Sequence, residues 1–158
     1  NLGQFSFGHQ VNVGYYAQEH DNLAPDASLL ENIRASVPRG VLLTETQLRG
    51  LLGMMGLSGE KVYQESGTLS GGEKTKLALA MLMVGRNNLL LLDEPTNNLD
   101  PASRQEVLGA LSRYEGAVIL VTHDPGAVAA LSPERVLILP DGDEDLWNEG
   151  YADLVELA

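Results

Sequence analysis

Two short apolar runs in the second half of the chain limit the possible folds more than any other feature. Leu89 to Leu92 and Ala117 to Thr122 are brief and almost continuously apolar, which is typical of strands buried on both faces of a sheet. Helical patterns lie before and between them, from about Gly72 to Val84 and from Pro101 to Tyr114. Strands that alternate with helices predict an α/β fold, in which a parallel sheet is covered by helices on both faces.

The alternation continues toward the C-terminus. Pro125 to Leu131 fits a short helix, and Arg135 to Leu139 fits a third strand, which we expect to join the parallel sheet. Acidic side chains gather after this strand, and we interpret them as a solvated tail. They are Asp141, Asp143, Glu144, Asp145, Glu149, Asp153 and Glu156.

The first half of the chain predicts one strand followed by a small helical insert. Residues 11–15 alternate between apolar and polar or small side chains, as in a strand that ends near Gln18. Ser28 and Thr44 each stand where a side chain can cap a helix that carries an apolar stripe. The expected divisions are a strand region at 1–24, a helical subdomain at 25–68 and a second α/β part at 69–158.

Composition excludes several classes of function. The chain of 158 residues carries a formal net charge of −12, which disfavours broad contact with nucleic-acid backbones. It contains no cysteine, so disulfides and thiolate metal sites are excluded. No apolar run has the length of a membrane span. We therefore expect a cytoplasmic protein without a membrane partner.

Polar residues that suit phosphate chemistry follow both apolar runs. Ligands of parallel α/β sheets bind beyond the carboxyl ends of the strands, where Asp93, Glu94 and His123 stand. One carboxylate there can hold Mg²⁺ while the next orients an attacking water, although an acidic turn before Pro95 is the structural alternative. An imidazole can donate a hydrogen bond to phosphate, but a lone histidine after a buried strand also fits a purely structural role.

The segment Leu-Ser-Gly-Gly-Glu opens the helix expected from Gly72. Ser70 and Glu73 have the spacing of a capping box, which would explain both residues structurally. Gly71 and Gly72 cost helix stability, yet they let backbone amides approach a ligand, and a helix N-terminus suits an anion. Asp100, which precedes a proline, likewise fits a helix cap or a contact in a nucleotide site.

In this order and spacing, the segments resemble the ATP-binding cassette (ABC) family, a branch of the P-loop NTPases. Asp93 and Glu94 match the Walker B aspartate and the catalytic glutamate of that family, and His123 matches its switch histidine. Gln18 matches the Q-loop glutamine. The resemblance implies ATP as the substrate, Mg²⁺ held by Asp93 and Gln18, an attacking water polarised by Glu94, and a γ-phosphate held by His123.

The resemblance also implies that two cassettes share each nucleotide. Ser70, Gly71, Gly72 and Glu73 match the signature segment, which in the family contacts the ATP of the opposite cassette, and many members have Gln in place of this Glu. Asp100 matches the D-loop aspartate. We therefore expect Gln18, Asp93, Glu94 and His123 to converge at one edge of the sheet, with Ser70 apart from them.

Within the family, the strings GYYAQEH, LSGGEK, DEPTNNLD and VTHD resemble the ABC-F proteins, soluble twin-cassette ATPases that act on the ribosome. The ending LWNEGYADLVELA resembles the close of their second cassette. The implied partners are another cassette in the same full-length chain and the ribosome. The alternatives are the nucleotide-binding subunit of a membrane transporter and a non-catalytic interaction module.

One element of the family pattern is missing from these residues. No Gly-x-x-x-x-Gly-Lys-Ser/Thr occurs in the sequence, so the loop that clamps the β- and γ-phosphates is not present. The chain thus resembles the C-terminal part of a cassette, with a partial P-loop NTPase core and a small helical subdomain. We expect these 158 residues to show no ATPase activity by themselves.

Overall fold

The computed structural model describes residues 6–16, 22–139 and 141–157. Its centre is a parallel sheet in which β1 (Val13–Tyr16), β2 (Leu89–Asp93) and β3 (Ala117–Val121) lie in the order β1-β2-β3. The register places Tyr15 beside Leu91, and Leu91 beside Ile119. The α/β class and the parallel sheet are therefore confirmed.

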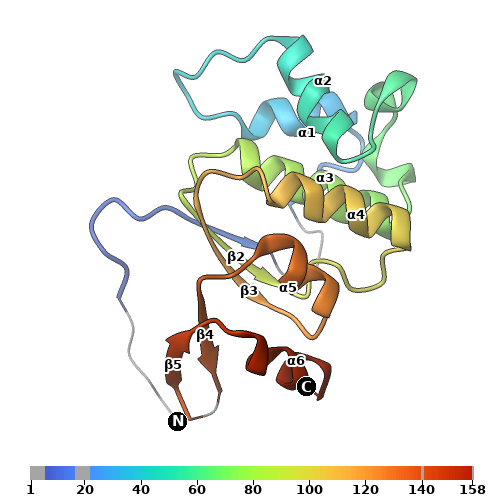
Figure 1. The fold of residues 1–158 in the computed structure, drawn as a ribbon. Coiled ribbons are helices and arrows are strands. Elements are labelled where there is room, and N and C mark those ends of the chain that lie inside the picture. Colours follow the sequence, from blue (N-terminus) through green and yellow to red (C-terminus); the bar gives the residue numbers. More distant parts are fainter. Residues whose placement is uncertain (1–5, 17–21, 140, 158) are drawn as a thin grey trace.

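Two long helices cover one face of this sheet (Figure 1). They are α3 (Gly71–Val84) and α4 (Pro101–Leu111), which contact each other. Leu90 and Leu92 of β2 are fully buried, as are Leu77 and Leu79 of α3. These side chains belong to one apolar cluster, so the helices and the sheet share a single core.

The expected insert is helical, and it packs on α3 on the side away from the sheet (Figure 1). Its elements are α1 (Leu29–Ser36), α2 (Glu45–Met54) and two 3-10 turns, η1 (Gly59–Tyr63) and η2 (Ser66–Thr68). Ser28 and Thr44 cap the starts of α1 and α2 as predicted, and each also forms a complete capping box. Among the described residues, no helix has the length and apolarity needed to cross a membrane.

The opposite face of the sheet is more open than expected. Tyr15 is 53% exposed and Ile119 is 51% exposed, although both are paired with Leu91 of the middle strand β2. We expected helices on both faces. The helix that follows β3, α5 (Pro125–Leu131), is only 7 residues long and contacts α4, so it leaves much of this face uncovered.

The C-terminal part corrects two expectations. β4 (Arg135–Ile138) is a strand, but it pairs antiparallel with β5 (Asp143–Leu146) and does not join the parallel sheet. The pairing includes an ion pair of 2.6 Å between Arg135 and Glu144. Part of the acidic segment is therefore a strand, although all four residues of β5 are exposed. The last elements are η3 (Glu149–Tyr151) and α6 (Ala152–Leu157).

Candidate functional site

The carboxyl ends of β2 and β3 bring Glu94 and His123 into direct contact. Asp93 is paired with Val121 across the two strands, so the residues that follow each strand leave the sheet at the same edge. His123 Nδ1 lies 2.7 Å from Glu94 Oε1, and the backbone amide of His123 donates to the same oxygen at 3.2 Å. An ionised carboxylate can only accept, so Nδ1 carries the proton in this pair.

The turn after β2 holds Glu94 in an uncommon backbone conformation. Its φ is 48°, in the left-handed region, and Asn98 in the same turn has a φ of 60°. The backbone amide of Glu94 donates to the carbonyl oxygen of Val121 at 2.9 Å, which fixes the turn to the end of β3. A left-handed residue that carries a Cβ costs free energy, and such residues cluster at functional sites.

Asp93 is exposed at the end of β2, and no hydrogen bond or ion pair of its side chain is seen within the described residues. A single free carboxylate suits Mg²⁺, which proteins commonly bind through one or two carboxylates together with substrate phosphates. No cluster of three or more candidate ligands occurs in the described part of the chain. Gln18, the other expected metal contact, lies outside the described residues.

A network of polar contacts around Asp124 supports the loop of His123, and no sequence motif predicted it. Asp124 accepts hydrogen bonds from the buried Thr96 hydroxyl at 3.1 Å and from the Gly126 amide at 2.9 Å. Arg104 Nη1 lies 3.5 Å from the same carboxylate. Because Thr96 follows Glu94 in the β2 turn and Asp124 follows His123, this network joins the two loops that carry the pair.

The signature segment forms the first turn of α3. Ser70 is the N-cap, its hydroxyl accepts from the Glu73 amide at 3.3 Å, and Glu73 accepts from the Ser70 amide at 2.9 Å. The capping box is therefore real. It leaves the amides of Gly71 and Gly72 without a hydrogen bond in the described structure, as expected for the first amides of a helix.

Asp100 is a helix cap. Its carboxylate accepts from the amides of Ala102 and Ser103 at 3.1 Å each, and Pro101 occupies the first position of α4. Hydrogen bonds from Ser103 and then from Ala102 hold the pKa of Asp100 below its usual value. The structural explanation for Asp100 is thus complete, and a nucleotide contact remains a prediction.

A small hollow of about 180 Å³ lies between the turn that carries Glu94 and the start of α3. It is lined by Tyr16, Gly71, Gly72, Thr75, Glu94, Asn97, Asn98 and Leu99. Gly72 packs closely here, because a Cβ at this position would lie 3.2 Å from a methyl carbon of Leu99, which would have to shift slightly. Ser70 does not line the hollow, but the neighbouring glycines bring the signature segment nearer to Glu94 than we expected.

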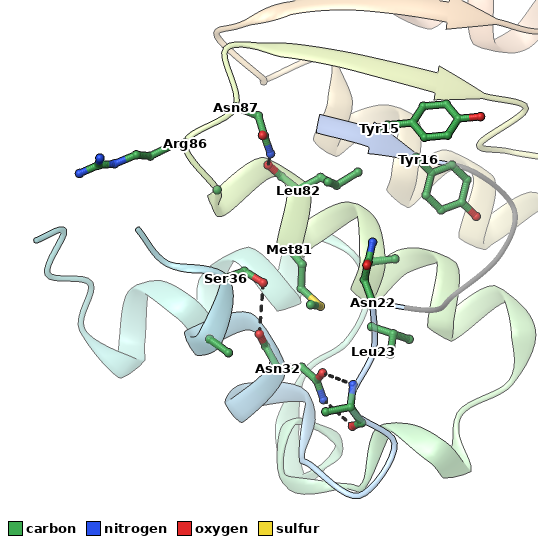
Figure 2. A pocket seen from close by; sticks show the side chains of 14 residues that line it. Tyr15, Tyr16, Asn22, Leu23, Asn32, Ser36, Met81, Leu82, Arg86 and Asn87 are labelled. Carbon is green, nitrogen blue, oxygen red and sulfur yellow. Dashed lines mark hydrogen bonds between the residues drawn. The ribbon is translucent and has the colours of Figure 1, made fainter. Parts of the chain in front are cut away.

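A larger cavity of about 650 Å³ lies between β1, α1 and the C-terminal half of α3 (Figure 2). Its principal buried polar side chain, Asn32, is fully engaged: its oxygen accepts from the Ala24 amide, and its nitrogen donates to backbone oxygens and to Ser66. None of the predicted site residues lines this cavity. Among the described residues that line it, no buried side chain is left without a hydrogen bond that a ligand would supply, and Tyr16 lines both this cavity and the hollow beside Glu94.

Comparisons with known proteins identify the family of the chain. The family described as "ABC transporter" matches residues 7–97. A "Probable ATP-binding protein YheS" of Escherichia coli is 35% identical over 96% of this chain, and a "Putative ATP-binding protein YdiF" of Bacillus subtilis is 38% identical over 98%. The chain spans about a quarter of the length of these curated relatives.

Solved structures of ATP-binding cassettes share the fold. A dimeric structure of the cassette MJ0796 in a post-hydrolysis state, bound to ADP and Pi, superposes with a TM-score of 0.67 at 26% identity. The match covers 86% of this chain and 63% of that one. A second dimeric structure of MJ0796, described as a bacterial ABC transporter cassette, gives a TM-score of 0.69. The chain belongs to the ABC transporter ATP-binding cassette family.

Proposed function

We propose that this chain supplies two half-sites of an ATPase: the hydrolytic edge for one ATP and the signature contact for another. The contact between Glu94 and His123 carries the proposal. The fold joins these two residues, which are 29 positions apart in the sequence, at the sheet edge where ligands of parallel α/β proteins bind. A cassette remnant with only a binding role would have no need for this pair.

In the proposed reaction, Glu94 accepts the proton of a water that attacks the γ-phosphorus. The bond from that phosphorus to the bridging oxygen breaks, which gives ADP and inorganic phosphate. His123 donates from Nε2 to a γ-phosphate oxygen while Nδ1 remains with Glu94. Asp93 and Gln18 would hold Mg²⁺, which would neutralise charge on the phosphates.

The signature contact serves the nucleotide of the facing cassette. The Ser70 hydroxyl accepts from the Glu73 amide in the capping box, and its proton, which can point to the Glu73 carboxylate, can turn to a phosphate oxygen. The amides of Gly71 and Gly72 add two further donors at a helix N-terminus. Both solved structures of the similar cassette MJ0796 are dimers, which supports a pairing of two cassettes around the nucleotide. A phosphate loop has to come from outside these 158 residues.

For the intact protein, we propose a cytoplasmic ABC-F ATPase that binds the ribosome with ATP bound and its cassettes closed. Support comes from the strings LSGGEK and DEPTNNLD and from relatives whose names describe ATP-binding proteins. Hydrolysis would reopen the cassettes and release the ribosome. A competing function is the nucleotide-binding subunit of a transporter. It is favoured by the relative YkpA of Bacillus subtilis, described as an "Uncharacterized ABC transporter ATP-binding protein" and 33% identical.

The experiment is sedimentation of the full-length Glu94→Gln protein with ribosomes, with and without ATP. Co-sedimentation that depends on ATP supports the ribosomal function, since blocked hydrolysis should hold the closed complex together. Protein that stays in the supernatant with ATP, and that co-purifies with a membrane protein, supports the transporter function instead. The wild-type protein is the control, and it should sediment less than the variant because it turns ATP over.

A further inference from the structure

Glu73 uses the two oxygens of its carboxylate for different contacts. Oε2 accepts a hydrogen bond of 2.9 Å from the Ser70 amide and so closes the capping box. Oε1 faces the ammonium group of Lys61, with which it forms an ion pair. The carboxylate is thus fixed in the signature turn, by which we mean residues 69–73, beside the glycine amides that we assign to phosphate binding.

A fixed carboxylate in the signature turn opposes the proposed ligand. Helix N-termini attract anions, but a negative charge a few ångströms from a phosphate repels it, and solvent screens that repulsion only in part at a half-buried site. Hydrogen bonds from Lys61 and then from the Ser70 amide lower the pKa of Glu73. The carboxyl therefore stays ionised near neutral pH, so the repulsion is present whenever ATP is bound.

Lys61 is placed to cancel this charge. It belongs to η1, whose neighbouring residue Val62 is fully buried in the core. The Gln64 amide donates to the Lys61 carbonyl oxygen at 3.0 Å, and the Leu29 amide donates to the Gln64 carbonyl oxygen at 3.2 Å. The backbone of Lys61 is therefore anchored in the helical insert.

The pair lies at the boundary between protein and solvent. The Lys61 side chain is 36% exposed and that of Glu73 is 25% exposed. Among the ion pairs of the described residues, no other cation reaches Glu73. Lys61 is consequently the single charge that balances the acid of the signature turn in the described structure.

Building on the proposed function, we propose that Lys61 is a positioning residue of the nucleotide site. By pairing with Glu73, it removes net negative charge from the signature turn and so allows that turn to receive the γ-phosphate of ATP. The role is indirect, because Lys61 acts through Glu73 and contacts no phosphate itself. No sequence pattern predicts this role, since the two residues are 12 positions apart and belong to different elements.

The test measures the KM for ATP of the full-length protein, together with its stability in urea. Lys61→Met keeps the length of the side chain and removes the charge, and we expect the KM to rise about tenfold with kcat nearly unchanged. Lys61→Arg should behave as wild type. The double variant Lys61→Met with Glu73→Gln should restore the KM to within about twofold, because the amide keeps the bond to Ser70 and carries no charge.

Lys74→Met is the matched control, since it removes the same charge from the residue next to Glu73, and no ion pair of Lys74 occurs among the described residues. Its KM should change by less than about threefold. The proposal is overturned if Lys61→Met leaves the KM unchanged, if the double variant is as impaired as the single one, or if Lys74→Met has an equal effect. A wild-type protein that neither binds nor hydrolyses ATP would instead overturn the proposed function, and Lys61's role with it.

Discussion

Glu94 Oε1 accepts two hydrogen bonds from His123, one from the imidazole Nδ1 at 2.7 Å and one from the backbone amide at 3.2 Å. Since Nδ1 must donate to a carboxylate, a donation from Nε2 to a phosphate requires the doubly protonated ring. Through this contact, the position of Glu94, the proposed base, depends on which ring nitrogens of His123 carry a proton.

The first prediction concerns Glu94→Gln in the full-length protein. The amide keeps the shape of the side chain but cannot take a proton from water, so ATP hydrolysis should fall by at least about 100-fold while ATP binding persists. Glu115→Gln is the control, because Glu115 precedes β3 and lies at the other end of the sheet. Steady-state phosphate release is the measurement. A loss of less than about threefold, below 1 kcal/mol in barrier height, would show that Glu94 is not the base.

The second prediction uses the backbone of the same residue. With a φ of 48°, Glu94 occupies a region that costs a residue with a Cβ about 1–2 kcal/mol. Glu94→Gly and Glu94→Ala both lose the contact with His123, but only glycine relieves this strain. The Gly variant should therefore be more stable than the Ala variant by about 1 kcal/mol in urea unfolding. Equal stabilities would mean that the turn relaxes out of the left-handed region in the Ala variant.

Local signals predicted the elements of the fold well, because each is encoded within a few residues. The caps at Ser28, Thr44, Ser70 and Asp100 all form as their spacing predicts. The partner of β4 could not be predicted in this way, because a strand pattern fixes the alternation of side chains and not the strand beside it. The same limit applies to the open face of the sheet, which depends on where the short α5 packs.

The residues of the candidate site could likewise be predicted only in part. Asp93, Glu94 and His123 could be placed at one edge, because parallel strands end together and each residue directly follows a strand. The Thr96 and Asp124 contact and the Lys61 and Glu73 pair could not, since each joins residues from separate elements through side-chain geometry. Whether Gln18 completes the metal site remains a prediction.

A third prediction tests the packing beneath α2. A Cβ at Gly56 would lie 2.3 Å from Glu106 Oε1, and Gly56 also has a φ of 68°. Glu106 forms an ion pair of 2.8 Å with the buried Lys76, and a shift of its carboxylate away from Gly56 would disturb this pair. Gly59→Ala is the control, with the same φ of 68° and no atom within 4 Å. Gly56→Ala should be less stable than Gly59→Ala by about 1–3 kcal/mol in urea unfolding. Equal losses of stability would show that backbone strain, and not the contact with Glu106, causes the whole loss.

The fourth prediction concerns the network that joins the two loops of the site. Thr96→Val removes the buried hydroxyl that donates to Asp124 and should cost about 1–3 kcal/mol of stability, because the carboxylate loses a donor in a mostly buried position. Thr46→Val, on the exposed surface of α2, is the matched control and should stay within about 0.5 kcal/mol. If the two variants lose the same stability, the contact between Thr96 and Asp124 contributes nothing measurable.

The last prediction follows from the lowered pKa of Glu73, for which the Lys61 hydrogen bond is the first cause and the Ser70 amide the second. A carboxyl whose pKa is lower in the folded state stabilises the protein above its unfolded pKa, and it loses that contribution as the pH falls through the folded value. Wild type should therefore be more stable than Glu73→Gln near pH 6, and the difference should shrink below about pH 4. Urea unfolding at a series of pH values measures it. In the Lys61→Met background the same comparison should show a smaller difference, because only the Ser70 bond then favours the ionised form; an unchanged difference would mean that Lys61 is not the main cause.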